Sequence, residues 1–387
     1  IDPIEHGAPT ITLDVYNSGN DSLLLWGQYA TLTVNFQEPV TSAINPDNAT
    51  SATSFSSAPD INLDNATGTL ATMSPIDNDN KTIWTGRFTP TTDREVDNNT
   101  ITLAASWTDQ VGNPGTSVTT SNFEVETLRP TVSSFTLSDT ALKAGDNATV
   151  TLDFSEAVAS FSSDADITVP NLDNGTTSGT LAAMTSSDNK IWAGIFTPTA
   201  NAEDASNTLS LTANSYKDLA GNDGPSETTE NYVVDTKAPS VSSLQLTDGV
   251  TTLSTFTDRC FPVTSNIIVT FSEAMVTSHI TTSTSDTHCA GSIQVSSDNF
   301  SSCVRMSTEP TASDNTNRTF TLNPNDNLSY YTTYKVIVTR EGYPAAKDVL
   351  GNNMSSQYDS SVFKTSSYPS SSPISGVFVG VGQYGKE

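Results

Sequence analysis

Acidic residues in short repeated motifs are the side chains whose type and spacing could do chemistry in this chain. The motif Asp-x-x-Gly-Asn occurs three times, the motif Phe-x-Glu also occurs three times, and a third acid recurs four residues before a proline. In chain order these carboxylates form three sets: Glu5, Glu38 and Asp109; Glu126, Glu156 and Asp218; Asp235, Glu273 and Asp348. Carboxylates in such groups are suitable ligands for Ca²⁺, which takes about 6–8 oxygen ligands in flexible geometry.

The segments that must position these acids are predicted to be β-strands. Apolar and polar residues alternate in TVTLDF (149–154) and TLSLTA (208–213), as expected for half-buried antiparallel strands, and the intervening loops are rich in Asn, Asp, Gly and Pro. No helical periodicity of convincing length is present. The central part of the chain reads as seven strands, which we expect to form one β-sandwich.

An up-and-down order of these strands places the acids at the joints between sandwiches. The Phe-x-Glu motif ends the second strand and the Asp-x-x-Gly-Asn motif lies in the loop before the last strand, so both fall at the same end of a sandwich. The acid before the proline belongs to the linker that arrives at this end. Proline fixes φ and extends the residue before it, which stiffens the linker. Three like charges at one joint repel unless a cation neutralises them, so we expect calcium at each joint.

A purely structural role for the same residues stays open. Asp-x-x-Gly-Asn is also a good turn, because glycine supplies positive φ and the Asp side chain can cap main-chain N–H groups. The Phe-x-Glu acid could be solvated. Neither an EF-hand loop nor a calcium-binding nonapeptide array is present. The metal prediction therefore depends on the coincidence of three acids at each joint.

Composition limits the partners of this chain. It has 387 residues with 43 acids against 16 bases, a net charge of −27, and hydrophobic residues make up 35%. Such a chain lacks the Lys and Arg that phosphate contacts need, so we expect no nucleic-acid partner. No apolar run is long enough to span a membrane. The richness in Ser, Thr, Asn and Asp favours an extracellular setting.

Internal repeats predict the domain organisation. VNFQEPV, LDFSEAV and VTFSEAM recur at nearly equal steps, and GTLATMS with IWTGRFTPT matches GTLAAMT with IWAGIFTPT. Units of this length fit single β-sandwiches. We therefore predict an all-β protein of three tandem Ig-like antiparallel sandwiches in an elongated array. The predicted boundaries are 1–127, 128–236, 237–367 with a Cys-containing insertion, and 368–387 for a Pro/Ser spacer and a strand tail.

The first two units resemble the Ig-like repeats of large bacterial surface adhesins and biofilm-associated proteins. The resemblance is carried by LSDTALKAGDNATVTLDFSEAV, IWAGIFTPTANAEDASNTLSLTA, DLAGNDG and VVDTKAPSV. The third unit is similar to the Ig-like module of surface-layer and cell-envelope proteins through VTFSEAM, YKVIVT and AKDVLGNNMSS. The resemblance implies the Ig-like fold, an extracellular or bacterial cell-surface location, and joints that calcium stiffens. It covers the chain to about Thr365 and indicates no particular ligand.

Catalytic motifs are absent from the sequence, so we do not expect an enzyme. There is no Gly-x-Ser-x-Gly, His-Glu-x-x-His or phosphate-binding P-loop motif, and only three histidines, His6, His279 and His288. A glycosidase would need two carboxylates in one groove, and these acids instead fall in repeated turns. Trp84 and Trp192 are expected in the core. Trp26 and Trp107 are harder to place, and an exposed one could stack on a sugar.

Three cysteines permit at most one internal disulfide. Cys289 and Cys303 flank AGSIQVSSDNFSS, which reads as a hairpin, so we expect these two to pair and Cys260 to be the free thiol. Three reduced and buried thiols are the alternative, which the extracellular character of the chain disfavours.

The C-terminal segment is predicted to be an unpaired strand. After SSVFKTS no linker acid is present, and a spacer, YPSSSP, leads to ISGVFVGVGQYG. Exposed strands add to the edges of other sheets, so Gly376–Tyr384 could dock on a neighbouring copy. It could equally be a linker to a further domain or fold back on its own sandwich.

The sequence thus predicts an extracellular structural protein, an adhesin stalk or surface-filament subunit with calcium-stiffened joints. Its expected partners are other copies of itself or further repeats of the same surface protein, with a cell-surface glycan or protein as a further candidate. The alternative is a glycan- or protein-binding module whose recognition surface is the third unit.

Overall fold

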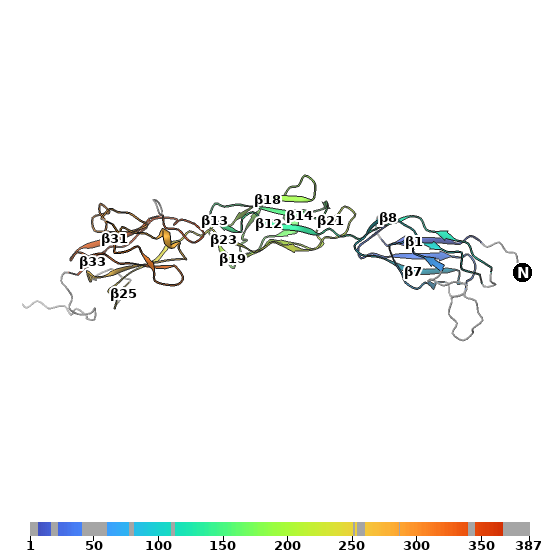
Figure 1. Ribbon diagram of the computed structural model, residues 1–387, viewed down its shortest axis with the longest axis horizontal. Coiled ribbons are helices and arrows are strands. Elements are labelled where there is room, and N and C mark those ends of the chain that lie inside the picture. Colours follow the sequence, from blue (N-terminus) through green and yellow to red (C-terminus); the bar gives the residue numbers. More distant parts are fainter. Residues whose placement is uncertain are drawn as a thin grey trace, which may run out of the picture.

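Three β-sandwich units follow one another along the long axis of the molecule, with the first unit at the end labelled N (Figure 1). The computed structural model describes residues 7–16, 22–40, 60–76, 81–109, 113–250, 252–253, 260–285, 287–339 and 345–366. The predicted all-β fold of three tandem Ig-like units is confirmed, since the helices described are two short turns. Glu5, His6 and the tail strand Gly376–Tyr384 lie outside the described residues.

The first unit has one antiparallel sheet in the order β1-β3-β7-β5, with β6 also pairing β7, and two smaller sheets, β10-β9-β4 and β2-β11-β8. Its strands are β1 (Thr10–Val15), β2 (Leu23–Leu25), β3 (Ala30–Asn35), β4 (Ile61–Asn62), β5 (Gly68–Leu70), β6 (Ser74–Pro75), β7 (Ile83–Pro90), β8 (Glu95–Asn99), β9 (Thr102–Leu103), β10 (Val118–Thr119) and β11 (Phe123–Glu126).

The second unit repeats this plan with sheets β12-β14-β18-β17, β13-β23-β19, β15-β21 and β16-β20-β22. Its elements are β12 (Val132–Leu137), β13 (Ala141–Lys143), β14 (Ala148–Phe154), β15 (Val158–Ala159), α2 (Ser163–Asp166), β16 (Ile167–Thr168), β17 (Gly179–Leu181), β18 (Ile191–Pro198), β19 (Glu203–Asn207), β20 (Ser210–Leu211), β21 (Lys217–Asp218), β22 (Glu227–Thr228) and β23 (Tyr232–Asp235).

The third unit has two larger sheets, β25-β24-β27-β30-β29 and β26-β33-β31-β28, with β32 also pairing β31. Its elements are β24 (Val241–Thr247), β25 (Thr252–Leu253), β26 (Cys260–Phe261), β27 (Asn266–Phe271), η1 (Thr277–His279), β28 (Ile293–Ser296), β29 (Thr311–Ala312), β30 (Thr319–Leu322), β31 (Thr333–Val338), β32 (Tyr358–Asp359) and β33 (Phe363–Thr365).

Alternation of apolar and polar residues explains why the long central strands form and which face they bury. In β14 every second residue from Ala148 to Phe154 is buried, and β3 and β27 show the same period. Their buried faces contribute to a separate hydrophobic cluster in each unit. The repeated Phe36, Phe154 and Phe271 are fully or almost fully buried in these clusters. Each phenylalanine therefore anchors the acid two residues after it at the end of the core.

Each unit contains a short parallel strand pair, which differs from the antiparallel pairing that the sequence predicts. β2 runs parallel to β11, β13 to β23, and β26 to β33. The predicted strand TLSLTA (208–213) is also shorter than expected, because β19 ends at Asn207 and β20 spans only Ser210–Leu211. The parallel pair brings the chain after β2 or β13 to the lower end of its unit, which is the end from which the linker to the next unit leaves.

Candidate metal site at the joints between units

The second joint brings together the three acids that the sequence assigned to it. Asp235 ends β23 of the second unit, Glu273 follows β27 of the third, and Asp348 opens the third unit's repeated turn. One carboxylate oxygen from each lies within 4.8 Å of the others. All three are buried, with exposed fractions of 7%, 4% and 0%. Among the described residues this is the one group of three potential metal ligands at such distances.

The repeated turn determines how Asp348 is held. Its Oδ1 accepts hydrogen bonds from the main-chain N–H of Gly351 (2.7 Å) and Asn352 (2.9 Å), and its Oδ2 accepts one from Asn352 Nδ2 (2.8 Å). Gly351 has φ +99°, which the turn requires and which glycine adopts without strain. An ionised carboxylate can accept about four hydrogen bonds, so these three leave room for one further contact. The turn and ligand roles of this aspartate are therefore compatible.

Negative charge at the second joint is poorly compensated. Burial, together with the charges of Asp235 and Asp348, raises the pKa of Glu273 to about 7. Burial and then Asp348 raise the pKa of Asp235 to about 6. The nearby cation, Lys237, pairs with the exposed Glu203 at 3.2 Å. Buried charges are costly unless they are paired, so this arrangement favours either protons or a bound cation.

The first joint has the same three acids in a looser arrangement. Asp218 is buried, while Glu126 and Glu156 are half-buried. Burial, with Glu95, Asp218 and Glu156, raises the pKa of Glu126 to about 7, and burial, with Asp218, raises that of Glu156. Glu126 Oε1 accepts a hydrogen bond from the N–H of Leu128 (2.9 Å), which turns it toward its own linker.

Only part of the predicted set that belongs to the first unit, Glu5, Glu38 and Asp109, can be placed. Asp109 is buried and Glu38 is half-buried in the first unit, while Glu5 lies outside the described residues. Asp109 makes the same contacts as its counterparts, since its Oδ1 accepts from the N–H of Asn113 (2.8 Å) and its Oδ2 from Asn113 Nδ2 (2.7 Å). The described contacts between the aspartate and the asparagine of this motif are thus the same in all three units.

The asparagine of the repeated turn bridges neighbouring units. At the second joint Asn352 Oδ1 accepts a hydrogen bond from the N–H of Ala144 (2.8 Å), and its Nδ2 donates to the main-chain oxygen of Asp235 (2.7 Å). At the first joint Asn222 Oδ1 accepts from the N–H of Trp26 (2.8 Å), and its Nδ2 donates to the oxygen of Leu128 (3.3 Å). The aspartate of the turn therefore orients the asparagine, and the asparagine binds the preceding unit.

Sequence reasoning missed both this bridging role and a fourth acid at each joint. Glu95 and Glu203 lie opposite the linker acids, in register with Glu126 and Asp235 respectively. The sequence does contain a signal for Glu95 and Glu203. Each of them follows the last residue of the matching segments TGRF and AGIF by seven residues. Like charges directly opposite on paired strands are destabilising, so each of these pairs adds to the repulsion at its joint.

The lower end of the third unit breaks the pattern. The hydroxyl of Thr365 bonds to Ser329 O and accepts from Thr332 N–H, as the hydroxyl of Thr236 does with Thr199 and Ala202. This correspondence places Lys364 where the second unit has Asp235. Lys364 lies in register with Thr333, whereas Asp235 lies in register with Glu203. This end therefore has no acid at either position.

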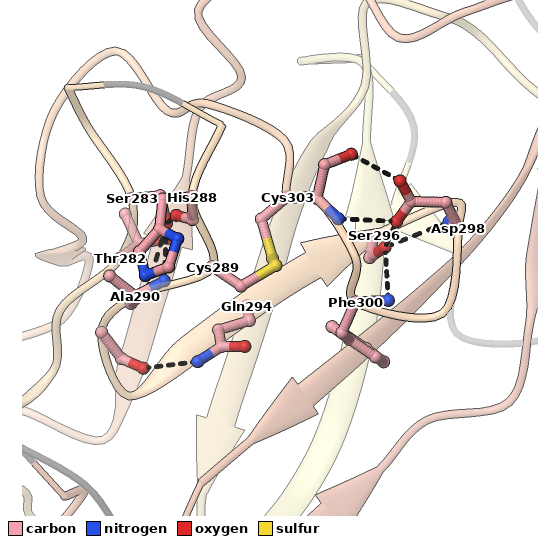
Figure 2. The surroundings of a disulfide bond; sticks show 12 residues. Thr282, Ser283, His288, Cys289, Ala290, Gln294, Ser296, Asp298, Phe300 and Cys303 are labelled. Carbon is pink, nitrogen blue, oxygen red and sulfur yellow. Dashed lines mark hydrogen bonds between the residues drawn. A yellow bond between two sulfur atoms is a disulfide. The ribbon is translucent and has the colours of Figure 1, made fainter.

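The predicted disulfide is present in the third unit. Cys289 and Cys303 are joined with a Cα–Cα distance of 4.9 Å, and Cys260 is free and exposed. Figure 2 shows the loop that this bond closes, in which Asp298 accepts hydrogen bonds from Ser296 Oγ (2.8 Å) and from Ser302 N–H (2.9 Å) and Oγ (2.6 Å). These bonds lower the pKa of Asp298 to about 2. The loop is therefore fixed at both its base and its turn.

Family comparison agrees with the three-unit fold. A family model described as a bacterial Ig-like domain matches residues 5–125 and 126–234, and another model with the same description matches residues 235–365. The chain belongs to the bacterial Ig-like domain family. No curated protein sequence matches it. No helix among the described residues has the length and apolar character needed to cross a membrane.

Two solved structures resemble the chain over most of its length. One is the structure of FdeC, described as an Escherichia coli adhesin, with 13% identity, 94% of this chain and 99% of that chain covered, and a TM-score of 0.33. The other is domains 1–6 of the surface-layer protein SbsC, with 14% identity, 93% of this chain and 54% of that chain covered, and a TM-score of 0.16.

Proposed function

We propose that this chain is a section of an extracellular rod, an adhesin stalk or surface-filament subunit, whose joints are stiffened by calcium. The observation that carries the proposal is the second joint, where carboxylates of two units converge within 4.8 Å. A ligand set shared between units resists bending, because any rotation of one unit pulls ligands away from the ion. The bacterial Ig-like domains that make up the chain support a non-enzymatic role at a bacterial cell surface.

The residues present fit calcium by their chemistry. Asp235, Glu273 and Asp348 supply hard oxygen donors, and the exposed Glu203 lies opposite Asp235 in register. Glu273 has one weak contact, from Ser272 Oγ at 3.4 Å, so its carboxylate is available for a cation. Calcium accepts such mixed and irregular ligand sets more readily than magnesium, which requires near-ideal octahedral geometry. When bound, calcium would offset the repulsion among these acids.

Calcium titration of the full chain tests the proposal. Glu273→Gln keeps the shape of the side chain and removes one charged ligand, so it should lower calcium affinity at least tenfold and reduce the calcium-dependent rise in Tm. Asp326→Asn makes the same charge change on an exposed loop of the third unit and should leave both unchanged. No calcium uptake by the unaltered chain, or equal affinity in both variants, would refute a calcium site at the second joint.

Self-association through the C-terminal segment is a separate part of the proposal. Gly376–Tyr384 contains β-branched and aromatic residues without charge, which favours strand addition to the sheet edge of another copy. Deleting residues 368–387 should abolish assembly seen by light scattering at high protein concentration. Assembly that survives the deletion rules the strand addition out and leaves the calcium proposal standing.

Recognition by the third unit has one structural observation in its favour. Asn299 and Phe300 both have positive φ, +58° and +64°, in the turn that Asp298 and the disulfide hold (Figure 2). Positive φ is a strained conformation for phenylalanine, and such strain is concentrated at functional sites. If this loop contacts a host glycan or protein, Phe300→Ala in the full chain should abolish binding to cells without changing Tm. Unchanged cell binding would exclude the loop.

A further inference from the structure

A cavity of 290 Å³ opens at the lower end of the first unit, and none of the acids assigned to the joint lines it. Its lining includes Trp26 and Gln28 from the turn after β2, Arg87 and Thr89 from β7, and Thr127 from the linker. The volume is close to the lower limit of small-molecule sites, about 300 Å³. The mixture of an aromatic ring, a guanidinium, an amide and hydroxyls is suited to a small polar ligand.

Arg87 gives this cavity a positive charge that no described carboxylate neutralises. The four ion pairs among the described residues involve lysines only. The Arg87 guanidinium lies 4.1 Å from the centroid of the Tyr29 ring, and Tyr29 in turn stacks on Tyr16 with 6.0 Å between centroids. Stacking on an aromatic face orients a guanidinium while leaving its N–H donors free for a carboxylate.

Trp26 provides a fixed aromatic surface beside this arginine. It is 45% exposed, although Arg129 lies 4.3 Å from the centroid of its ring. Its main-chain N–H is held by Asn222 across the joint. Gln28 is oriented as well, because its Oε1 accepts the N–H of Leu25 (2.9 Å), which leaves its Nε2 to donate elsewhere.

The second unit supplies an internal comparison, because its backbone is the same and its side chains differ. Ala30 pairs with Phe88 as Ala148 pairs with Phe196, so Arg87 corresponds to Ile195 and Tyr29 to Asn147. In the turn of the first unit the N–H of Gln28 donates to Leu25 O, and in the second unit the N–H of Asp146 donates to Lys143 O. The residue after the acceptor is Trp26 in the first turn and Ala144 in the second, so these two correspond. The aromatic and basic residues of the cavity are therefore additions to a framework that the second unit builds without them, although Trp26 also contacts Arg129 of the linker.

We propose that this cavity binds a carboxylated saccharide, such as a uronic acid residue of an acidic polysaccharide. Trp26 stacks on the apolar face of the sugar ring, because aromatic rings present a flat apolar surface. Arg87 pairs with the carboxylate, and Gln28 and Thr89 hydrogen-bond to the hydroxyl groups. The net charge of −27 does not prevent binding, since salt at physiological strength screens charges beyond about 8 Å. The proposal gives the rod a ligand and is independent of calcium at the joints.

Matched oligosaccharides and the full chain test the proposal. The probes are a tetramer of glucuronic acid and a glucose tetramer of the same linkage, which lacks only the carboxylates. We expect the acidic tetramer to bind with a Kd of about 1 mM or tighter by calorimetry and to change the fluorescence of the exposed Trp26. The neutral tetramer should bind at least tenfold more weakly.

The second unit suggests the variants. Arg87→Ile and Trp26→Ala introduce the residues found at Ile195 and Ala144, and each should weaken binding of the acidic tetramer at least tenfold without changing the secondary structure seen by circular dichroism. Arg305→Ile removes an exposed arginine from the third unit and should have no effect. The proposal is overturned by absent binding of the acidic tetramer at 10 mM (~2.7 kcal/mol), by equal affinity for the two tetramers, or by an unaltered affinity in Arg87→Ile.

Discussion

Asn352 of the third unit donates a hydrogen bond from Nδ2 to the main-chain oxygen of Asp235 in the second unit, at 2.7 Å. The same amide group donates to Asp348 Oδ2, so one asparagine connects a candidate metal ligand in one unit to the strand end that carries another. The joint therefore has two components, a set of neutral hydrogen bonds and a set of carboxylates. They can be separated by experiment.

Replacing the bridging asparagine should uncouple the second and third units. Asn352→Ala removes the bonds to Ala144 N–H and Asp235 O, and leaving the buried main-chain oxygen of Asp235 unsatisfied costs about 1–3 kcal/mol. Hydrogen exchange at the Ala144 amide should accelerate, and the unfolding transitions of the two units should separate. Both are measured on the full chain, by NMR and by calorimetry.

Asn113→Ala is the matched control for this variant. Asn113 makes the same contacts with Asp109, and its described hydrogen bonds remain within the first unit. It should leave exchange at Ala144 unchanged. Equal exchange rates in Asn352→Ala and the unaltered chain would show that the bridge contributes nothing to coupling.

In chelator, stability should fall as the pH rises from about 5 to about 8. The pKa values of Glu126 and Glu273 are raised from 4.5 to about 7, and that of Asp235 from 3.8 to about 6. The folded chain then binds more protons than the unfolded chain between these values, so raising the pH removes stability. Melting curves measured by circular dichroism at several pH values check the slope.

Excess calcium should flatten or reverse this slope, because the ion competes with protons for the same carboxylates. Glu273→Gln should reduce the slope in chelator. A Tm in chelator that rises steadily from pH 5 to pH 8 would contradict the assignment of raised pKa values to the joints.

Removing the disulfide should destabilise the third unit selectively. The double change of Cys289 and Cys303 to serine opens a loop with a sequence separation of 14 residues, which costs about 2–4 kcal/mol. The transition of the third unit should move to lower temperature in calorimetry, while those of the first two units stay in place. Equal shifts in all transitions would mean that the units unfold as one body.

The convergence of Asp235, Glu273 and Asp348 could be predicted because it depends on strand direction and on motifs that repeat within the chain. The repeated phenylalanine fixes the register of β3, β14 and β27, so the acid two residues later falls at the same end each time. The short parallel strands could not be predicted, since two or three residues such as Ala141–Lys143 carry no periodic signal. Their pairing depends on tertiary contacts.

The finer arrangement of the joints lay beyond the sequence for a related reason. Glu126 and Asp235 hold equivalent positions, and each accepts the N–H two residues on, from Leu128 (2.9 Å) and from Lys237 (3.3 Å). Among the described residues, however, only the second joint brings its three acids within 4.8 Å of one another. Glutamate and aspartate differ in side-chain length at this position, and no motif shows where the longer carboxylate lies. The cavity beside Trp26 was also hidden, because its lining comes from three separate segments.

Small-angle scattering of the full chain in calcium and after exhaustive chelation tests the central claim most directly. If calcium holds the joints, the calcium-bound chain should scatter as a straight rod, and chelation should shorten its maximum dimension and broaden its distance distribution. Glu273→Gln in calcium should resemble the chelated chain more closely than Asp326→Asn does. Scattering profiles that coincide with and without calcium would contradict the account.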